Sequence, residues 1–179
     1  MRENNYKPQM PDVMEAIFDA AYLIFDLVAA VLFFIFSKGN TLFVLYGVLT
    51  LTLCGGDAFH LVPRAIALCT TGLDNFTVQL GLGKWITSIT MTIFYVVLYH
   101  IWRERYQIKG HKAATAATYG LAGLRIVLCM MPQNKWLTAD APLSWGIYRN
   151  IPFALMIPKT CAYVWTVLIG YKAMKKEAA

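Results

Sequence analysis

Five apolar stretches of bilayer length constrain the fold of this chain more than any other feature of its sequence. They cover residues 16–36, 42–60, 85–102, 113–131 and 151–171. A helix needs about 20 apolar residues to cross a bilayer. Helices are required because an open strand would leave backbone groups unpaired in hydrocarbon. The sequence therefore predicts an all-α fold, a helical integral membrane protein with about five transmembrane helices in a single domain over residues 1–179.

The composition agrees with a membrane environment. The chain is 58% hydrophobic and only 15% charged, whereas soluble domains carry about 25% charged residues. This excludes a soluble enzyme, a disordered tail and a disulfide scaffold. The net charge of +6 does not require a nucleic-acid partner, and none is predicted. Basic residues beside membrane spans are common anchors that also favour anionic lipid headgroups.

The connections between the spans predict the topology. The stretch Leu61–Lys84 contains Pro63 and several glycines, which predicts a loop with a short surface helix. With five spans, the first and third connections and the C-terminal tail share one side of the membrane. They hold eight basic residues: Lys38, Arg103, Arg105, Lys109, Lys112, Lys172, Lys175 and Lys176. The other side holds six: Arg2, Lys7, Arg64, Lys84, Lys135 and Arg149. This difference predicts a multi-pass protein of the cell membrane with its N-terminus outside and its C-terminus in the cytoplasm.

The first span contains acids that hydrocarbon disfavours. A central Asp, Lys or Arg costs about 2.5–3.5 kcal/mol to insert. At 100° per residue, all the acids of this helix fall within a stripe about 60° wide: Asp12, Glu15, Asp19 and Asp26. This helix therefore needs polar partners in the protein rather than lipid.

The end of the second span combines polar residues with small ones. Asp57, His60 and Arg64 share one helical face. Gly55 and Gly56 would let a neighbouring backbone approach closely. An aspartate three residues before a histidine can hold the imidazole ring by a hydrogen bond, which makes His60 a candidate proton carrier. Asp57 and His60 are thus the candidate catalytic residues.

The remaining spans also carry polar groups. Depth along the helices places most of them near the predicted outer side, where we expect a ligand-binding set: Asp19, Arg64, Lys84, Ser88, Tyr95 and Arg125. Asp26 and Lys159 lie about 15 and 12 Å below the outer ends of their helices, at 1.5 Å per residue. They are predicted to form a structural ion pair.

These charges have two interpretations. They can bind only one another and fix helix packing, or they can line an outward-facing cavity that binds or transports a small anionic or amphipathic, lipid-like ligand. The cations Arg64, Lys84 and Arg125 would attract the anionic part of such a ligand. The five spans are few for a transporter built of inverted repeats, so a homo-oligomer or a role as an accessory subunit is a further alternative.

One part of the chain resembles a known family. The Gly56-Asp57 step, followed by an apolar pair, and the later helix end Phe94-Tyr95-Val96-Val97-Leu98-Tyr99-His100 are similar to the YhhN-type lysoplasmalogenase family. Members of that family are multi-pass membrane hydrolases that cleave the vinyl-ether bond of lysolipids. The resemblance covers about residues 45–102 and implies a catalytic role for Asp57, with His100 as a partner.

A membrane hydrolase is therefore the alternative function. Asp57 would act as a general base on water and His60 as a proton relay, with a lysolipid as substrate. A metal-dependent version would need ligands such as His60, His100, Asp57 and Ser88. Zinc usually takes tetrahedral His and Cys sites, and the cysteines are scattered without a paired motif. The sequence thus predicts no metal and no cofactor.

Overall fold

The computed structural model describes the backbone of residues 6–138 and 153–178, and the side chains of residues 6–138 and 162–176. These residues form five α-helices: α1 (Met10–Phe36), α2 (Thr41–Cys69), α3 (Thr77–Arg105), α4 (Lys112–Met130) and α6 (Phe153–Ala178). Two short 3-10 helices, η1 (Leu73–Phe76) and η2 (Pro132–Asn134), complete the described elements. The prediction of an all-α helical fold is confirmed.

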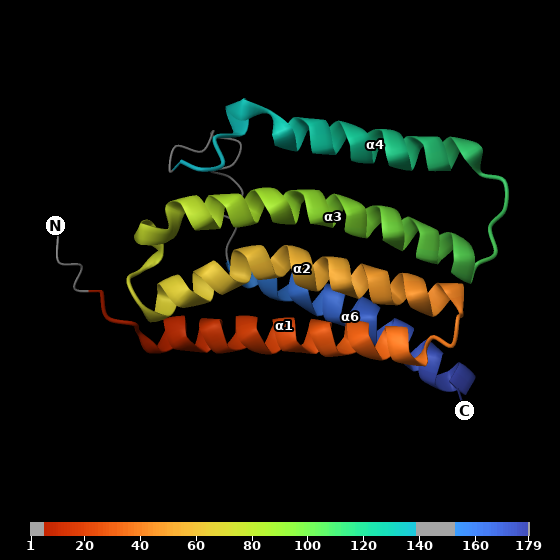
Figure 1. Cartoon of the computed structure of the whole chain (residues 1–179), viewed down its shortest axis with the longest axis horizontal. Helices are drawn as coiled ribbons and strands as arrows, with labels where there is room; N and C mark the ends of the chain where they lie inside the picture. The colour runs from red at the N-terminus through yellow and green to blue at the C-terminus, as the bar shows by residue number, and fades with distance from the viewer. Residues whose placement is uncertain (1–5, 139–152, 179) are drawn as a thin grey trace.

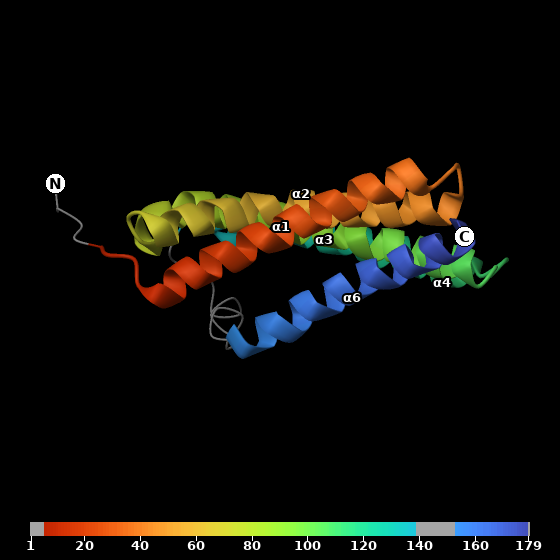
Figure 2. The ribbon, with the colours of Figure 1, turned by 90° about the horizontal axis from the view of Figure 1, so that it is seen from below.

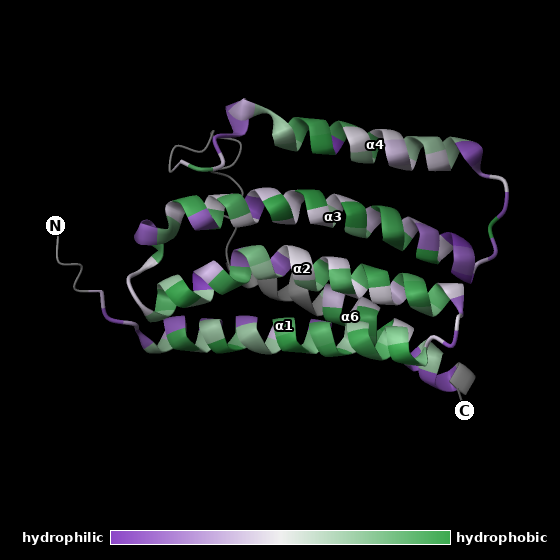
Figure 3. Ribbon diagram, viewed as in Figure 1, coloured by the Kyte–Doolittle hydropathy of each residue, from purple (hydrophilic) through white to green (hydrophobic). Residues whose placement is uncertain are grey.

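Four stretches are long and apolar enough to cross a membrane: α1, α2, α4 and the segment Leu73–Arg105 that contains α3. These four candidate spans, identified by length and composition, indicate a multi-pass helical membrane protein. The fifth predicted span, residues 151–171, corresponds to α6. The side chains at the start of this helix, residues 153–161, lie outside the described residues. Hydrophobic residues run along the helices, and hydrophilic residues gather at the adjoining ends of α3 and α4 (Figure 3).

The helices run side by side with alternating direction from α1 to α4 (Figure 1). α1, α3 and α6 begin at the end of the bundle where α2 and α4 end, which we call the amino end. The opposite end, called the carboxyl end, holds the α1–α2 turn, the α3–α4 loop and the end of α6 (Figure 2). The first and third connections and the end of α6 thus share one end, as the sequence predicts. Which end faces the cytoplasm stays a prediction.

The predicted loop over Leu61–Lys84 is shorter than expected, since only residues 70–76, with the short helix η1, connect α2 and α3. Helix α2 continues through Pro63 to Cys69, and α3 begins at Thr77. Proline lacks the N–H that would bond the carbonyl four residues earlier, on Phe59. The helix therefore bends near this point (Figure 1) instead of ending.

Helices α2 and α3 approach each other closely beside this bend. A Cβ atom on Gly83 would overlap the Phe59 carbonyl oxygen and the Cα of His60, and one on Gly56 would overlap the Thr90 side chain. Thr87 Oγ1 donates a hydrogen bond to the Gly56 carbonyl oxygen at 2.8 Å. We call these contacts the α2–α3 seam. The glycines that suggested a loop are thus helix-packing residues.

The apolar core lies toward the carboxyl end and joins α1, α2, α3 and α6. Phe33 of α1 stacks on Tyr46 of α2 with ring centroids 5.6 Å apart, and both side chains are buried. Phe94 of α3 meets Tyr163 of α6 edge to face at 5.4 Å. The apolar core thus joins these four helices toward the carboxyl end.

Helix α4 is attached mainly by polar contacts. Of its 19 residues, only Cys129 is buried. Tyr99 Oη of α3 lies 2.9 Å from Thr115 Oγ1, and His100 Nε2 lies 2.8 Å from Tyr119 Oη. Near the amino end, Trp136 follows α4, and its indole N–H donates to the Cys129 carbonyl oxygen at 2.8 Å.

Candidate functional site

Helices α1 and α2 meet through polar side chains in the amino half of the bundle. Tyr22 Oη donates a hydrogen bond to Asp57 Oδ2 at 3.0 Å. About two turns nearer the amino end, Arg64 of α2 forms an ion pair with Glu15 of α1. Both Asp57 and Arg64 therefore face α1, where the acidic stripe of that helix lies.

Two further acids of α1 are buried beside these pairs. Asp19 is 7% exposed and Asp26 is 0% exposed. Asp57 lies within electrostatic range of both carboxyl groups, and Arg64 lies within range of Asp19. We call Glu15, Asp19, Asp26 and Asp57, together with Tyr22 and Arg64, the acidic cluster. Among the described side chains it contains four acids and one base.

The buried acids are not fully satisfied. Neither carboxyl oxygen of Asp26, nor Oδ2 of Asp19, has a hydrogen-bond partner within the described residues. The Tyr22 hydroxyl lies beside the Asp26 carboxyl group, but its single proton is directed at Asp57. A charged carboxylate in this position would be costly without a positive partner.

A second polar group adjoins the cluster on the side of α3, α4 and α6. The Tyr163 hydroxyl of α6 interacts with Tyr95 of α3, and it lies within electrostatic range of both Asp57 and Arg125. Tyr95 is 49% exposed, and Arg125 of α4 is also exposed. We call Tyr95, Tyr163 and Arg125 the tyrosine–arginine surface. Polar residues from five helices thus lie within electrostatic range of their neighbours, with acids in the buried part and Arg125 in the exposed part.

Other predicted site residues lie near this region with different partners. Ser88 Oγ donates to the carbonyl oxygen of Lys84 within α3 at 2.8 Å, and the Lys84 side chain is exposed. His60 is half-buried, and its backbone packs against Gly83. His100, which the family resemblance pairs with Asp57, instead faces α4 and lies next to Tyr119.

The predicted ion pair between Asp26 and Lys159 stays a prediction. Lys159 belongs to α6, one turn before Tyr163, but its side chain lies outside the described residues. Within the part of the chain that the structure describes, no group of three or more His, Cys, Asp or Glu residues could hold a metal ion.

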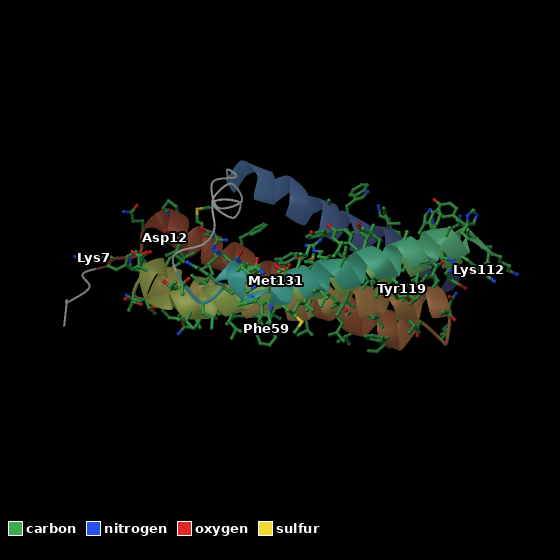
Figure 4. All side chains as sticks on the ribbon, turned by 90° about the horizontal axis from the view of Figure 1, so that it is seen from above. Lys7, Asp12, Phe59, Lys112, Tyr119 and Met131 are labelled. Atoms are coloured by element: carbon green, nitrogen blue, oxygen red, sulfur yellow. The ribbon has the colours of Figure 1, made fainter. Side chains whose placement is uncertain are left out.

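The side-chain sticks separate the site from its surroundings. Asp12 lies at the amino end, and Lys112 and Tyr119 lie toward the carboxyl end (Figure 4). Phe59 lies on the face of the bundle away from α6 (Figure 4) and is 55% exposed. This face of α2 therefore presents apolar side chains outward, while Asp57 and Arg64 face inward.

Sequence reasoning missed Tyr22 and did not include Tyr163 among the site residues. Tyr22 lies four residues before Asp26, so helical phase places both on one face of α1. The sequence therefore contains this spacing, but a tyrosine in an apolar span does not by itself indicate a functional residue. Its significance emerges only when α2 brings Asp57 opposite.

Comparison with known proteins finds no matching family model, no matching curated protein and no matching solved structure.

Proposed function

We propose that this membrane protein binds a small amphipathic ligand at the tyrosine–arginine surface, with the anionic group of the ligand at Arg125. The two phenol rings would contact its less polar part. Such a ligand is lipid-like and can reach the site from the bilayer. Tyr95 and Arg125 belong to the ligand-binding set predicted from the sequence, and Tyr163 is added to them because of its position beside both.

The state of Arg125 is the observation that carries the proposal. Its side chain is exposed although it belongs to a membrane-spanning helix, about 7.5 Å from the end of α4 by helical rise. Among the described residues no hydrogen bond or ion pair engages its guanidinium group. Intramembrane arginines normally face a partner or a polar cavity. Arginine also presents a planar fork of donors that suits carboxylate and phosphate groups.

The other predicted cations fit this role less well. Arg64 is already paired with Glu15, and both side chains are mostly buried. Asp19 adds a second acid within range of Arg64. An anionic ligand would therefore meet repulsion in the acidic cluster and attraction at Arg125, which favours binding at the exposed side.

Thermal unfolding with matched lipids tests this proposal. Purified protein is mixed with lysophosphatidate or with monoacylglycerol of the same acyl chain. A ligand present at a hundredfold excess over its Kd stabilises the folded state by about 2.7 kcal/mol. We expect stabilisation by the anionic lipid only. Loss of a charge-assisted hydrogen bond, about 1.5–3 kcal/mol, should greatly reduce it in Arg125→Gln.

Arg105→Gln is the matched control, because Arg105 is an exposed arginine in the last turn of α3, at the carboxyl end. It should leave the stabilisation unchanged. Equal stabilisation by both lipids, or full stabilisation of Arg125→Gln, would contradict the proposal. Absence of any lipid effect on the wild-type protein would contradict it as well.

A hydrolase is the second candidate. Asp57 is half-buried and oriented by Tyr22 at 3.0 Å, with His60 one turn further along the same face of α2. An oriented carboxylate next to a histidine suits general-base chemistry on water. A vinyl-ether lysolipid would be hydrolysed by the wild type and by Asp74→Asn, an exposed control in η1, but not by Asp57→Asn. A wild type without activity in this assay would refute the hydrolase candidate.

A further inference from the structure

The buried end of the acidic cluster has a feature that the proposed ligand does not explain. Asp26 has no exposed surface, and neither of its carboxyl oxygens has a hydrogen-bond partner among the described residues. In a membrane protein, an ionisable group in such a place marks a functional path or requires a counter-charge. The proposed ligand site lies at Arg125, so this observation is independent of it.

The groups that face Asp26 are mostly neutral or acidic. Tyr22 approaches it from α1, and Cys54 and Asp57 approach it from α2. Tyr163 of α6 and Tyr95 of α3 follow beyond Asp57, and Asp19 and Arg64 lie nearer the amino end. The Lys159 side chain lies outside the described residues. A negative charge on Asp26 would thus add to the charge of Asp57 at low dielectric, which is strongly unfavourable.

The direction of the Tyr22 hydroxyl provides a second observation. A phenol has one proton to donate and lone pairs that can accept. Tyr22 donates to Asp57 Oδ2 at 3.0 Å, which leaves its oxygen, beside Asp26, as an acceptor. Neither Asp26 oxygen is in hydrogen-bond geometry with any described group, so a protonated Asp26 carboxyl group would have to rotate toward Tyr22 to donate to that oxygen. An ionised Asp26 would compete with Asp57 for the single phenolic proton. The hydrogen-bond direction therefore suits a neutral Asp26 next to an ionised Asp57.

We propose that Asp26 carries a proton and exchanges it with Asp57 through the Tyr22 hydroxyl. Once the Asp26 carboxyl group rotates toward Tyr22, its proton passes to the Tyr22 oxygen, while the phenolic proton of Tyr22 passes to Asp57 Oδ2. One proton moves in total, Tyr22 is again a neutral phenol afterwards, and nothing is oxidised or reduced.

The exposure of the side chains gives this relay a direction. Asp26 is 0% exposed and Tyr22 is 8% exposed, whereas Asp57 and Tyr163 are half-buried. Tyr95, which interacts with Tyr163, is 49% exposed. The chain of polar groups thus leads from the interior of the bundle to its surface. The relay connects a buried proton site with the surface on which Arg125 lies.

Infrared difference spectroscopy on the purified protein without added ligand tests the relay. A protonated carboxyl group has a carbonyl stretch that a carboxylate lacks. We expect this band in the wild type, its loss in Asp26→Asn and a shifted band in Asp26→Glu. The second variant serves as the test if Asp26→Asn fails to fold. A carboxyl band unaffected by both substitutions means that Asp26 is ionised, as a pair with Lys159 would require, and overturns the proposal.

Hydrogen–deuterium exchange of the same band tests the path. Tyr22→Phe keeps the ring and removes only the hydroxyl, so exchange at Asp26 should slow by about tenfold or more, the effect of a barrier raised by at least 1.36 kcal/mol. Tyr46→Phe is the control, since Tyr46 is a buried tyrosine in the apolar core. Equally fast exchange in Tyr22→Phe and wild type would refute the relay. Both measurements are made without lipid, so their outcome does not depend on ligand binding at Arg125 and can fail or succeed independently of the ligand experiment.

Discussion

Substitution of Gly83 by alanine tests how α2 and α3 are held together. A Cβ atom at this position meets the Phe59 carbonyl oxygen and the Cα of His60. These are backbone atoms of a neighbouring helix, so neither can rotate aside as a side chain can. The two helices must separate, and the hydrogen bond from Thr87 to the Gly56 carbonyl oxygen should lengthen.

The magnitude follows from three terms. Overpacking typically costs about 1–3 kcal/mol, and backbone obstruction favours the upper end of that range. A hydrogen bond between membrane helices contributes about 0.6 kcal/mol on average. Alanine instead of glycine in a helix interior returns about 1 kcal/mol. We therefore expect a net destabilisation of about 2–3 kcal/mol, and a melting temperature lower by about 4–12 °C for a chain of this size.

Thermal unfolding of the purified protein in one detergent is the assay. Gly55→Ala is the matched control, because Gly55 lies in the same α2 helix and a Cβ atom there meets nothing within 4 Å. That substitution should leave the stability unchanged or raise it by up to about 1 kcal/mol. If Gly83→Ala and Gly55→Ala melt at the same temperature, the close approach of α2 and α3 does not exist in the folded protein.

Two further predictions concern the amino end of the bundle. Glu15→Gln should destabilise the protein by about 2 kcal/mol, less than the 3–5 kcal/mol of a fully buried pair, because Glu15 and Arg64 are 20% and 18% exposed. The double variant Glu15→Gln, Arg64→Gln should be more stable than Glu15→Gln in thermal unfolding, and equal or lower stability would refute this reasoning. A hydrogen bond to Asp12 raises the pKa of Tyr6. Protonated Tyr6 therefore contributes fully to the stability of the folded protein below its usual pKa of about 10. Its contacts with Asp12 and Leu68 should be lost as the pH rises through the raised pKa. In tyrosinate absorbance titrations with Tyr6→Phe as reference, Asp12→Asn should shift the Tyr6 transition to lower pH, and an unchanged transition would show that Asp12 is not the cause.

The main features of the fold could be predicted from the sequence because they depend on local properties. Apolar length identified the helices, and helical phase placed Asp57 and Arg64 on one face of the second span. The difference over Leu61–Lys84 has a physical cause. Pro63 and Gly83 disfavour an isolated helix, but tertiary contact between α2 and α3 at this position compensates for that tendency.

The candidate site was harder to predict because it depends on pairing between helices. Charge cost alone singled out Asp19 and Asp26, and the structure buries both. The role of Tyr22 depends on which helix lies opposite it. The helical phase of a single span carries no information about that neighbour. His100 shows the same limit, since the sequence near it does not reveal that α4 supplies its neighbour, Tyr119.

The sparse attachment of α4 has a consequence for how the protein matures during synthesis. Lipid tails are as apolar as leucine side chains, so helices in a bilayer associate through packing and hydrogen bonds. The hairpin of α1 and α2 can assemble as soon as both have left the translocon. Helix α4, with one buried residue, instead docks through Thr115 and Tyr119 onto an α3 that is already in place. The tyrosine–arginine surface is therefore completed late, because Arg125 arrives on α4 and Tyr163 arrives last with α6.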